Sequence, residues 1–174
     1  RRERFEYDDN GRLELEVNGV DSRTRYAYDE AGNVTRIIFA EGTSAEYTDR
    51  FEYDENDRLT AEIDGEGVRT EYDYDDRGNK IETRQGLNEA GTRYLDLERV
   101  TTYVYDDQDR LIQITNPEDG VTKYYPDAKG NHSIIEGADG TITVNTFDDD
   151  GRIETNIVGR GSVAPTSADG FAKA

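Results

Sequence analysis

A short aromatic and acidic phrase returns along the chain at nearly constant spacing, and this repetition constrains the fold more than any other feature. FEYDDNGRL occupies residues 5–13, FEYDENDRL residues 51–59 and YVYDDQDRL residues 103–111. Fixed-period similarity is typical of repeat proteins, in which each unit packs mainly on its neighbours. The aromatic residue before the acidic turn recurs at intervals of 21, 25, 21, 31, 20 and 22 residues. Its positions are Tyr7, Tyr28, Tyr53, Tyr74, Tyr105, Tyr125 and Phe147.

Each copy of the phrase predicts a β-hairpin. Two aromatic residues spaced two apart, such as Phe5 and Tyr7, lie on one face of a strand. The Asp that follows can accept a backbone hydrogen bond from two residues further on and so start a turn. The next marker is Gly or Asp, residues that adopt the positive φ of a tight hairpin. These turn residues are Asp8, Asp29, Asp54, Asp75, Asp106 and Asp148, followed by Gly11, Gly32, Asp57, Gly78, Asp109 and Gly151.

A second strand and a second turn complete the unit. Leu13, Leu15 and Val17 alternate with glutamates, the pattern of a half-buried strand. The second turns contain Asn18-Gly19, Asp64-Gly65, Asp119-Gly120 or Asp139-Gly140. The sequence therefore predicts an all-β fold of repetitive antiparallel β-hairpins that form a curved or spiralling sheet. We expect this repeat region to span residues 1–158 and residues 159–174 to form a linker or tail.

Two copies depart from the regular spacing. Extra residues at 86–100 predict a longer loop. The copy at 124–132 carries a proline and, counted from Tyr125, one additional residue, so we expect a bulge or an edge strand there.

The residue after the turn glycine or aspartate alternates between Arg and Asn. Each Arg precedes Leu or Ile, whereas the Asn residues precede Val, Lys or His. The alternation indicates a true period of two hairpins that occupy unequal environments. The positions are Arg12, Asn33, Arg58, Asn79, Arg110, Asn131 and Arg152.

The recurring rings have two interpretations. They can stack on neighbouring hairpins and supply a core, because each aromatic side chain buries about 150–250 Å². They can also form a platform on which a sugar or a peptide stacks. We favour the core ladder, since aliphatic residues are scarce in this chain.

Charge and composition exclude several classes of protein. Forty acidic against 21 basic residues give a net charge of −19, which opposes binding to nucleic acid or to anionic lipid. Low hydrophobicity with high charge is also typical of disorder, but 12 Tyr and 5 Phe in a regular pattern argue for a folded chain. No apolar run is long enough to span a bilayer as a helix, so we expect no membrane insertion. The chain begins inside the pattern, which predicts a segment of a longer protein.

No residue pattern indicates catalysis. His132 is the only histidine, and the neighbouring Ser133 does not make a catalytic triad. Acidic pairs are too numerous for any one to stand out as a hydrolase pair. The run DDDGR at 148–152 resembles part of a calcium loop, but the glycine and the bidentate glutamate of such loops are not at their places. We therefore predict no catalytic residue, no metal ligand and no cofactor, with calcium as the alternative.

The phrase Tyr-Asp-x-x-Gly-Arg-Leu resembles the repeat of the Rhs family, also called YD-repeat proteins. The residues that carry the resemblance are Tyr7-Asp8 with Gly11-Arg12-Leu13, Tyr28-Asp29 with Gly32-Asn33, Tyr53-Asp54 with Arg58-Leu59, Tyr74-Asp75 with Gly78-Asn79, Tyr105-Asp106 with Arg110-Leu111, and Phe147-Asp148 with Gly151-Arg152. The resemblance implies a spiral of β-hairpins. In bacterial toxin relatives such a strip builds a hollow shell around a toxin, and in the teneurins it belongs to a cell-surface adhesion protein.

The resemblance leads to one expected function and one alternative. We expect a non-enzymatic structural segment of a large secreted or cell-surface protein, which encloses or presents a toxin or effector domain. Its partners would be the rest of its own longer chain, an enclosed toxin domain or identical subunits. The alternative is a segment of an extracellular adhesin or of a self-assembling filament, because the edges of a sheet invite pairing with another copy.

Overall fold

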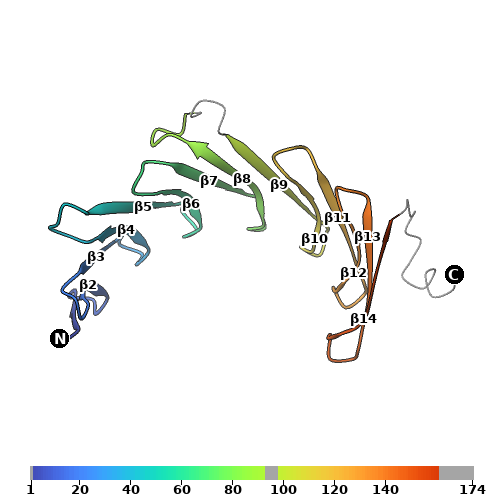
Figure 1. Cartoon of the computed structure of the whole chain (residues 1–174), viewed down its shortest axis with the longest axis horizontal. Helices are drawn as coiled ribbons and strands as arrows, with labels where there is room; N and C mark the ends of the chain where they lie inside the picture. Colours follow the sequence, from blue (N-terminus) through green and yellow to red (C-terminus); the bar gives the residue numbers. More distant parts are fainter. Residues whose placement is uncertain (1, 93–97, 161–174) are drawn as a thin grey trace. The chain divides into compact units, whose positions relative to one another are not determined.

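The computed structural model describes residues 2–92 and 98–160, and within them every regular element is a β-strand (Figure 1). Fourteen strands form one antiparallel sheet in which each strand pairs with its neighbours in chain order. The predicted all-β fold of repeated antiparallel hairpins is confirmed. The strands are β1 (Arg4–Tyr7), β2 (Leu13–Val17), β3 (Arg23–Tyr28), β4 (Val34–Phe39), β5 (Tyr47–Tyr53), β6 (Leu59–Ile63), β7 (Arg69–Tyr74), β8 (Lys80–Leu87), β9 (Arg99–Tyr105), β10 (Leu111–Thr115), β11 (Val121–Pro126), β12 (His132–Glu136), β13 (Thr141–Phe147) and β14 (Ile153–Arg160).

The chain divides into two compact units. One contains Arg1–Asp73 with Thr83–Arg99, and the other contains Tyr74–Glu82 with Val100–Ala174. The predicted tail, residues 159–174, lies almost wholly outside the described residues, although β14 continues to Arg160. No helix in the described parts of the chain is both long and apolar enough to cross a membrane.

A five-residue turn joins the two strands of each repeated hairpin. In the first, the amide of Asp8 donates to the carbonyl of Arg12 at 2.9 Å, and the amide of Gly11 donates to the carbonyl of Asp8 at 2.9 Å. Gly11 has a φ of 77°, and the strand register shifts between Glu6 and Tyr7. Such a turn followed by a left-handed residue and a bulge is a common hairpin connection. All six residues expected at the left-handed position have positive φ.

The copy at 124–132 is regular, which corrects the expectation of an additional residue. Asp127 opens a turn of the usual length, with Gly130 at the left-handed position. Pro126 therefore occupies the place of Tyr7, and Tyr124 occupies the place of Phe5. Strand β11 pairs with both β10 and β12, so it is not an edge strand, but its register with β12 shifts between Tyr125 and Pro126, as the expected bulge requires. The error arose because Tyr125 was taken as the anchor, although the turn is determined by the aspartate.

The opposite ends of the strands use the same kind of turn. The amide of Asn18 donates to the carbonyl of Ser22 at 3.0 Å, and Asp21, with a φ of 63°, takes the left-handed position. The equivalent residue after Asp64 is Gly67, with a φ of 81°. The glycines that follow Asn18 and Asp64 directly are not in the left-handed region, so these dipeptides lie in the turns without being their left-handed residues.

The extra residues at 86–100 are only partly described. Strand β8 extends to Leu87, and a turn from Asn88 to Thr92 follows it. The remainder of the predicted loop, residues 93–97, lies outside the described residues.

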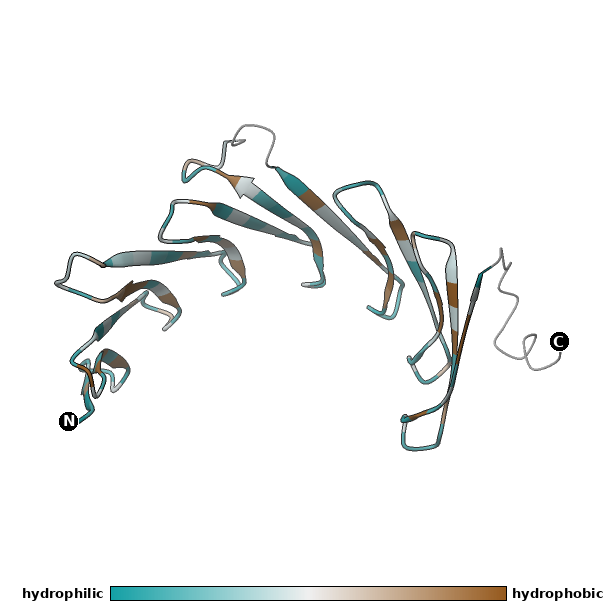
Figure 2. Ribbon diagram, viewed as in Figure 1, coloured by the Kyte–Doolittle hydropathy of each residue, from teal (hydrophilic) through white to brown (hydrophobic). Residues whose placement is uncertain are grey.

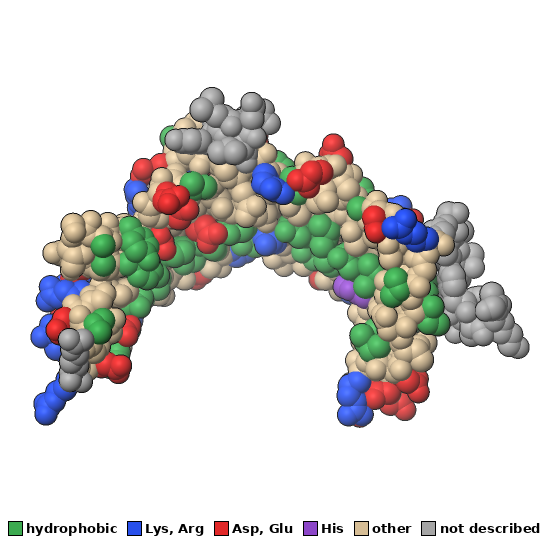
Figure 3. Space-filling view, in the orientation of Figure 1, with side chains coloured by type: hydrophobic (Ala, Val, Ile, Leu, Met, Phe, Trp, Pro, Cys, Tyr) green, Lys and Arg blue, Asp and Glu red, His purple; other side chains and the backbone are tan. Residues whose placement is uncertain are grey.

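The most buried apolar side chains are aliphatic, which corrects the prediction of an aromatic core. Tyr53 is only half-buried, and Tyr7 is 61% exposed. Apolar residues are spread over every hairpin, and many reach the surface (Figures 2 and 3). Leu15 is buried between Glu6 and Arg25 on the two adjacent strands, and long charged side chains cover apolar neighbours with their stems. The buried set is Leu15, Ala61, Ile63, Leu87, Ile134 and Ile142.

Candidate functional site

The strongest concentration of specific polar contacts lies in the turns that begin at the repeated aspartates, which we call the acidic turns: Asp8–Arg12, Asp29–Asn33, Asp54–Arg58, Asp75–Asn79, Asp106–Arg110, Asp127–Asn131 and Asp148–Arg152. In the first, Oδ1 of Asp8 accepts hydrogen bonds from the amides of Asn10 and Arg12, both at 2.9 Å. Its Oδ2 accepts one from Nε of Arg12 at 2.8 Å. The carboxylate thus uses both oxygens to hold its own turn closed.

These hydrogen bonds stabilise the ionised form of the aspartate. The pKa of Asp8 lies below its ordinary value mainly because the backbone amide of Arg12 donates to the carboxylate. The pKa of Asp54 is lowered for the same reason by the amide of Arg58. These carboxylates are therefore held as anions by their own turns and are not poised to exchange protons near neutral pH.

In two of the three turns with Asn at the fifth place, the Asn connects its hairpin to the next one through a carboxylate. Nδ2 of Asn33 donates to Oδ2 of Asp29 at 3.1 Å within its own turn, and to Oδ1 of Asp57 in the following turn at 2.8 Å. Asn79 makes the corresponding bond to Oδ1 of Asp109 at 2.9 Å. The acceptor in the following turn is the aspartate at the left-handed position.

An Arg at the same place reaches a different acceptor. The Nη1 atom of Arg12 donates to the backbone carbonyl of Asp29 at 3.0 Å, and Arg110 donates to the carbonyl of Asp127 at 3.0 Å. The guanidinium of Arg12 also lies 4.6 Å from the ring centre of Tyr28, within the range of a cation–π contact. Hairpins whose turn ends in Arg therefore bind a backbone carbonyl of the next hairpin, whereas those ending in Asn33 or Asn79 bind a carboxylate; we call the two kinds Arg hairpins and Asn hairpins.

This difference gives the alternation of Arg and Asn a physical meaning. After Asn33 and Asn79 the next hairpin has an aspartate at its left-handed position, Asp57 or Asp109, which accepts the bond from the asparagine, whereas after Asn131 the next hairpin has Gly151 there. A hairpin that follows an Arg needs only a backbone carbonyl, and in those hairpins the left-handed residue is glycine, as at Gly32 and Gly130. The repeating unit is thus a pair of hairpins, as the sequence indicated.

At residues 28, 53 and 105 the repeated tyrosine fastens its hairpin to the one before it. The hydroxyl of Tyr28 donates to the carbonyl of Leu13 at 2.7 Å, and the hydroxyl of Tyr53 donates to the carbonyl of Val34 at 3.0 Å. Tyr105 makes the equivalent bond to the carbonyl of Lys80 at 3.0 Å. The sequence indicated a ring at these positions but not this role of the hydroxyl. The signal was present, because five of the seven anchoring positions carry tyrosine, and the other two carry Pro126 and Phe147.

The last hairpin replaces this tyrosine with another donor. Phe147 has no hydroxyl, but Nδ2 of the buried Asn145 donates to the carbonyl of His132 at 3.2 Å. Residue 132 is equivalent to Leu13 and Lys80, so the same backbone carbonyl is bound in each case. The polar fastening between hairpins is therefore retained although the residue that provides it has changed.

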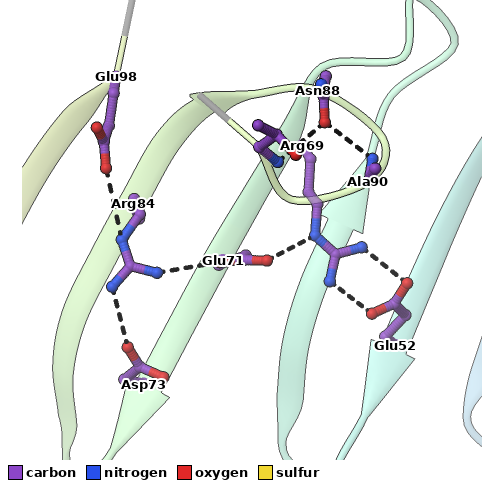
Figure 4. A network of polar contacts seen from close by, with 9 residues as sticks. Glu52, Arg69, Glu71, Asp73, Arg84, Asn88, Ala90 and Glu98 are labelled. Carbon is purple, nitrogen blue, oxygen red and sulfur yellow. Dashed lines mark hydrogen bonds and ion pairs between the residues drawn. The ribbon is translucent and has the colours of Figure 1, made fainter. Parts of the chain in front are cut away.

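A second polar network crosses three strands and the segment before β9 within the first unit (Figure 4). Arg69 on β7 makes two parallel bonds to Glu52 on β5, at 2.8 and 2.7 Å, and a third to Glu71 at 2.8 Å. Arg84 on β8 continues the network to Glu71 at 3.1 Å and to Glu98 at 3.7 Å. The side chain of Arg69 is 13% exposed, and bidentate pairing to Glu52 raises its pKa. The network therefore connects β7 to β5 across the intervening strand β6 and to the adjacent strand β8, and it keeps the arginine charged.

The contacts of the other candidate residues are structural. His132 lies against Tyr124 with ring centres 4.7 Å apart, and Ser133 donates to the carbonyl of Tyr125 at 2.9 Å. Two open hollows flank Phe51, and their polar lining includes Asp49 and Arg50. No group of three potential metal ligands occurs among residues 2–92 and 98–160. The described contacts can hold hairpins together, and they do not assemble a nucleophile with a base.

Antiparallel hairpins fastened turn to turn, each to its successor, define a repeat protein of the β-strip class. The model of the RHS repeat family matches residues 7–44 and 53–90. The resemblance to the Rhs, or YD-repeat, family is confirmed over these residues, each segment of which matches one RHS repeat. A search of curated proteins finds no match.

Solved structures show the same fold. A chain in the Photorhabdus luminescens Tc holotoxin pore aligns with a TM-score of 0.74 and 17% identity, over 91% of this chain and 9% of that one. A chain in the crystal structure of TcdB2-TccC3 aligns with a TM-score of 0.75 and 17% identity, again over 91% and 9%. This chain thus spans about a tenth of the length of these neighbours.

Proposed function

We propose that this chain is a non-catalytic structural segment of a large secreted or cell-surface protein. In this role it forms part of a β-shell or scaffold that encloses or presents a toxin or effector domain. The observation that carries the proposal is the use of the motif residues. The aspartate holds its own turn closed, and in several repeats the tyrosine and the Arg or Asn bind the backbone or the turn of an adjacent hairpin. A motif whose polar groups bind its own neighbours serves assembly.

The likeness to chains of toxin complexes supports this choice among repeat proteins. The proposed partners are the rest of the same longer chain and an enclosed toxin domain. A surface of net charge −19 suits a wall that stays soluble, and it disfavours contact with nucleic acid or anionic lipid. Turnover, a metal ion and a cofactor have no part in the proposal.

The test uses the natural protein that contains this segment. Electron microscopy should show a closed hollow particle, and a protease added to the intact protein should spare an internal domain. Deleting residues 8–147 joins Tyr7 to Asp148, so one hairpin with a complete acidic turn remains. This deletion should make the internal domain sensitive to the protease.

A matched control separates enclosure from general instability. Val20→Lys alters an exposed side chain in a turn between β2 and β3, and it should leave the protection intact. A solid rod in the images, or an internal domain cleaved equally before and after the deletion, would show that the segment does not enclose it.

A further inference from the structure

Two arginines lie directly opposite each other on adjacent strands of the first unit. The β4–β5 register pairs Arg36 with Arg50. The adjoining registers place Ala27 on β3 beside Arg36, and Ile63 on β6 beside Arg50. Residues paired in this way point to the same face of a sheet. One row across four strands therefore carries two positive charges side by side, flanked by two apolar side chains.

Arg36 is an exception among the arginines of this region. On the described strands β1–β8 the other arginines each have a carboxylate within ion-pair distance. They are Arg4, Arg23, Arg25, Arg50, Arg69 and Arg84. Arg36 makes no ion pair or hydrogen bond among the described residues, although 40 acidic residues of the chain face only 21 basic ones. Since like charges directly opposite each other destabilise a sheet, an anion bound between Arg36 and Arg50 would stabilise it.

Both arginines line an open hollow of about 440 Å³ on this face of the sheet. The other charged residues of its lining are Glu52 and Glu89. Glu52 is held by two parallel bonds from Arg69 (Figure 4), and Glu89 pairs with Arg50. Within the lining, the guanidinium of Arg36 is therefore left without a counter-charge. This balance suits a ligand group with a single negative charge.

The remaining walls of the hollow are largely apolar. Ala27, Phe51 and Ile63 contribute to them, and Ile63 is buried. A guanidinium binds a carboxylate through two parallel N–H···O bonds. A glutamate side chain carries such a carboxylate on a short apolar stem, which can contact these walls. Inorganic phosphate and sulfate have no apolar part, so the hollow favours a carboxylate on a carbon stem.

We propose that Arg36 and Arg50 form a binding site for a carboxylate side chain of an acidic polypeptide segment. Arg36 makes the bidentate pair, Arg50 donates a further hydrogen bond beside Glu89, and the stem of the ligand lies against Ala27 and Phe51. Every residue of the site belongs to one unit of the chain. The proposal goes beyond the shell function, since this face of the sheet would bind the segment in a shell, an adhesin or a filament alike.

A titration with two matched peptides tests the site on the full chain. The probe is acetyl-Ala-Ala-Glu-Ala-Ala-amide, and its control has Gln in place of Glu. The buffer contains about 0.15 M NaCl, which screens the repulsion from a net charge of −19 beyond about 8 Å. In ¹H–¹⁵N spectra, the Nε signal of Arg36, assigned by its loss in Arg36→Gln, should shift and saturate with the Glu peptide. The Gln peptide should leave it in place.

A pair of variants separates the site from the charge of the whole chain. Arg36→Gln should weaken binding of the Glu peptide at least about tenfold, because it removes the charge-assisted hydrogen bonds. Arg77→Gln makes the same change of charge in the other unit, at a side chain 53% exposed, and should leave the affinity unchanged. Arg36→Lys keeps the charge without the two parallel bonds, so its affinity should be intermediate. Equal weakening by Arg36→Gln and Arg77→Gln would overturn the proposal.

The stability of the free chain gives a readout that a structural role would move in the opposite direction. Arg36→Gln removes one of two opposed like charges, so without peptide this variant should melt at the temperature of the parent or above it. A lower melting temperature would assign Arg36 to the support of the fold and contradict its role in binding.

Competition at constant ionic strength identifies the ligand. Acetate should displace the Glu peptide only at concentrations at least about tenfold higher, because it lacks the two methylene groups of the stem. Equal potency of acetate and peptide would reduce the site to one for small anions only. Stronger displacement by inorganic phosphate than by acetate would show a phosphate site, and a signal of Arg36 that responds to no anion would show no site. These outcomes leave the proposed shell function untouched, because that function is tested by protease protection.

Discussion

The hydroxyl of Tyr53 is the most direct point at which to test the fastening between hairpins. Tyr53→Phe removes the donor to the carbonyl of Val34, at 3.0 Å, and keeps the ring. A typical intramolecular hydrogen bond contributes about 1 kcal/mol net to the free energy of unfolding. For a domain of this size that loss lowers the melting temperature by about 2–4 °C. Far-UV circular dichroism during heating measures the shift.

The chain contains its own control for this measurement. Tyr7 occupies the same place in its hairpin, but its ring is 61% exposed and its hydroxyl has no bonding partner among the described residues. Tyr7→Phe should leave the melting temperature unchanged. Equal shifts in the two variants, or no shift for Tyr53→Phe, would refute the role assigned to the hydroxyl.

Four further measurements test the turns and the charged network. The pKa of Asp8 and of Asp54 is lowered in the fold, so their contribution to the free energy of unfolding is present above the unfolded pKa of about 4 and is lost as the pH falls through the folded value. The urea midpoint should therefore drop below pH 4, and it should drop less steeply in Asp54→Asn. Burial raises the pKa of Tyr53 above 10.0, so its contribution to the free energy of unfolding is present below pH 10 and is lost as the pH rises through the higher folded value. Tyr53→Phe should weaken this loss of stability at alkaline pH. An identical loss in the variant and the parent would contradict the assignment. Gly151→Asp supplies Asn131 with the missing acceptor, because a Cβ at residue 151 lies 3.8 Å from Oδ1 of Asn131. The control is Gly140→Asp, where φ is also 77° and a Cβ has no atom within 4 Å. The Gly151→Asp protein should be about 0.5 kcal/mol more stable than the Gly140→Asp protein. Arg69→Met should lower the free energy of urea unfolding by about 2 kcal/mol, because it leaves Glu52 without its partner and Glu71 with Arg84 alone. Arg77→Met, at a side chain 53% exposed, should change little.

The turn geometry was predictable because it is local. Asp54 binds the amides of Asn56 and Arg58, which are two and four residues away in the chain. A contact over so short a distance depends on the order of residues and on few long-range events. For the same reason, the left-handed residues were placed correctly at Asp57 and at Gly78.

The frame of one hairpin was misjudged because aromatic residues tolerate substitution where the turn aspartate does not. Pro126 replaces the tyrosine, and the adjacent Tyr125 suggested a shifted anchor. Counting from Asp127 restores the frame, since the aspartates at 106, 127 and 148 are 21 residues apart. The residue that closes the turn is the more reliable marker of a repeat.

The core and the contacts between hairpins depended on which strands are neighbours. Leu15 and Tyr53 both belong to apolar sets in the sequence, yet Leu15 is buried and Tyr53 is half-exposed. The difference arises because Leu15 lies between long charged side chains on both adjacent strands, whereas a ring projects further from the sheet.

The sequence alone determined the hairpins and their turns, because backbone sterics and the bonds of one aspartate act within five residues. It also showed the two-hairpin period as an alternation of Arg and Asn, but not the contacts behind that alternation. Only the tertiary structure decided that Tyr28 bonds the carbonyl of Leu13 and that Arg12 reaches Asp29 while Asn33 reaches Asp57. Those partners lie 15–24 residues apart, and they meet only after the sheet register is established. Register depends on the pairing of whole strands, and no short segment encodes it.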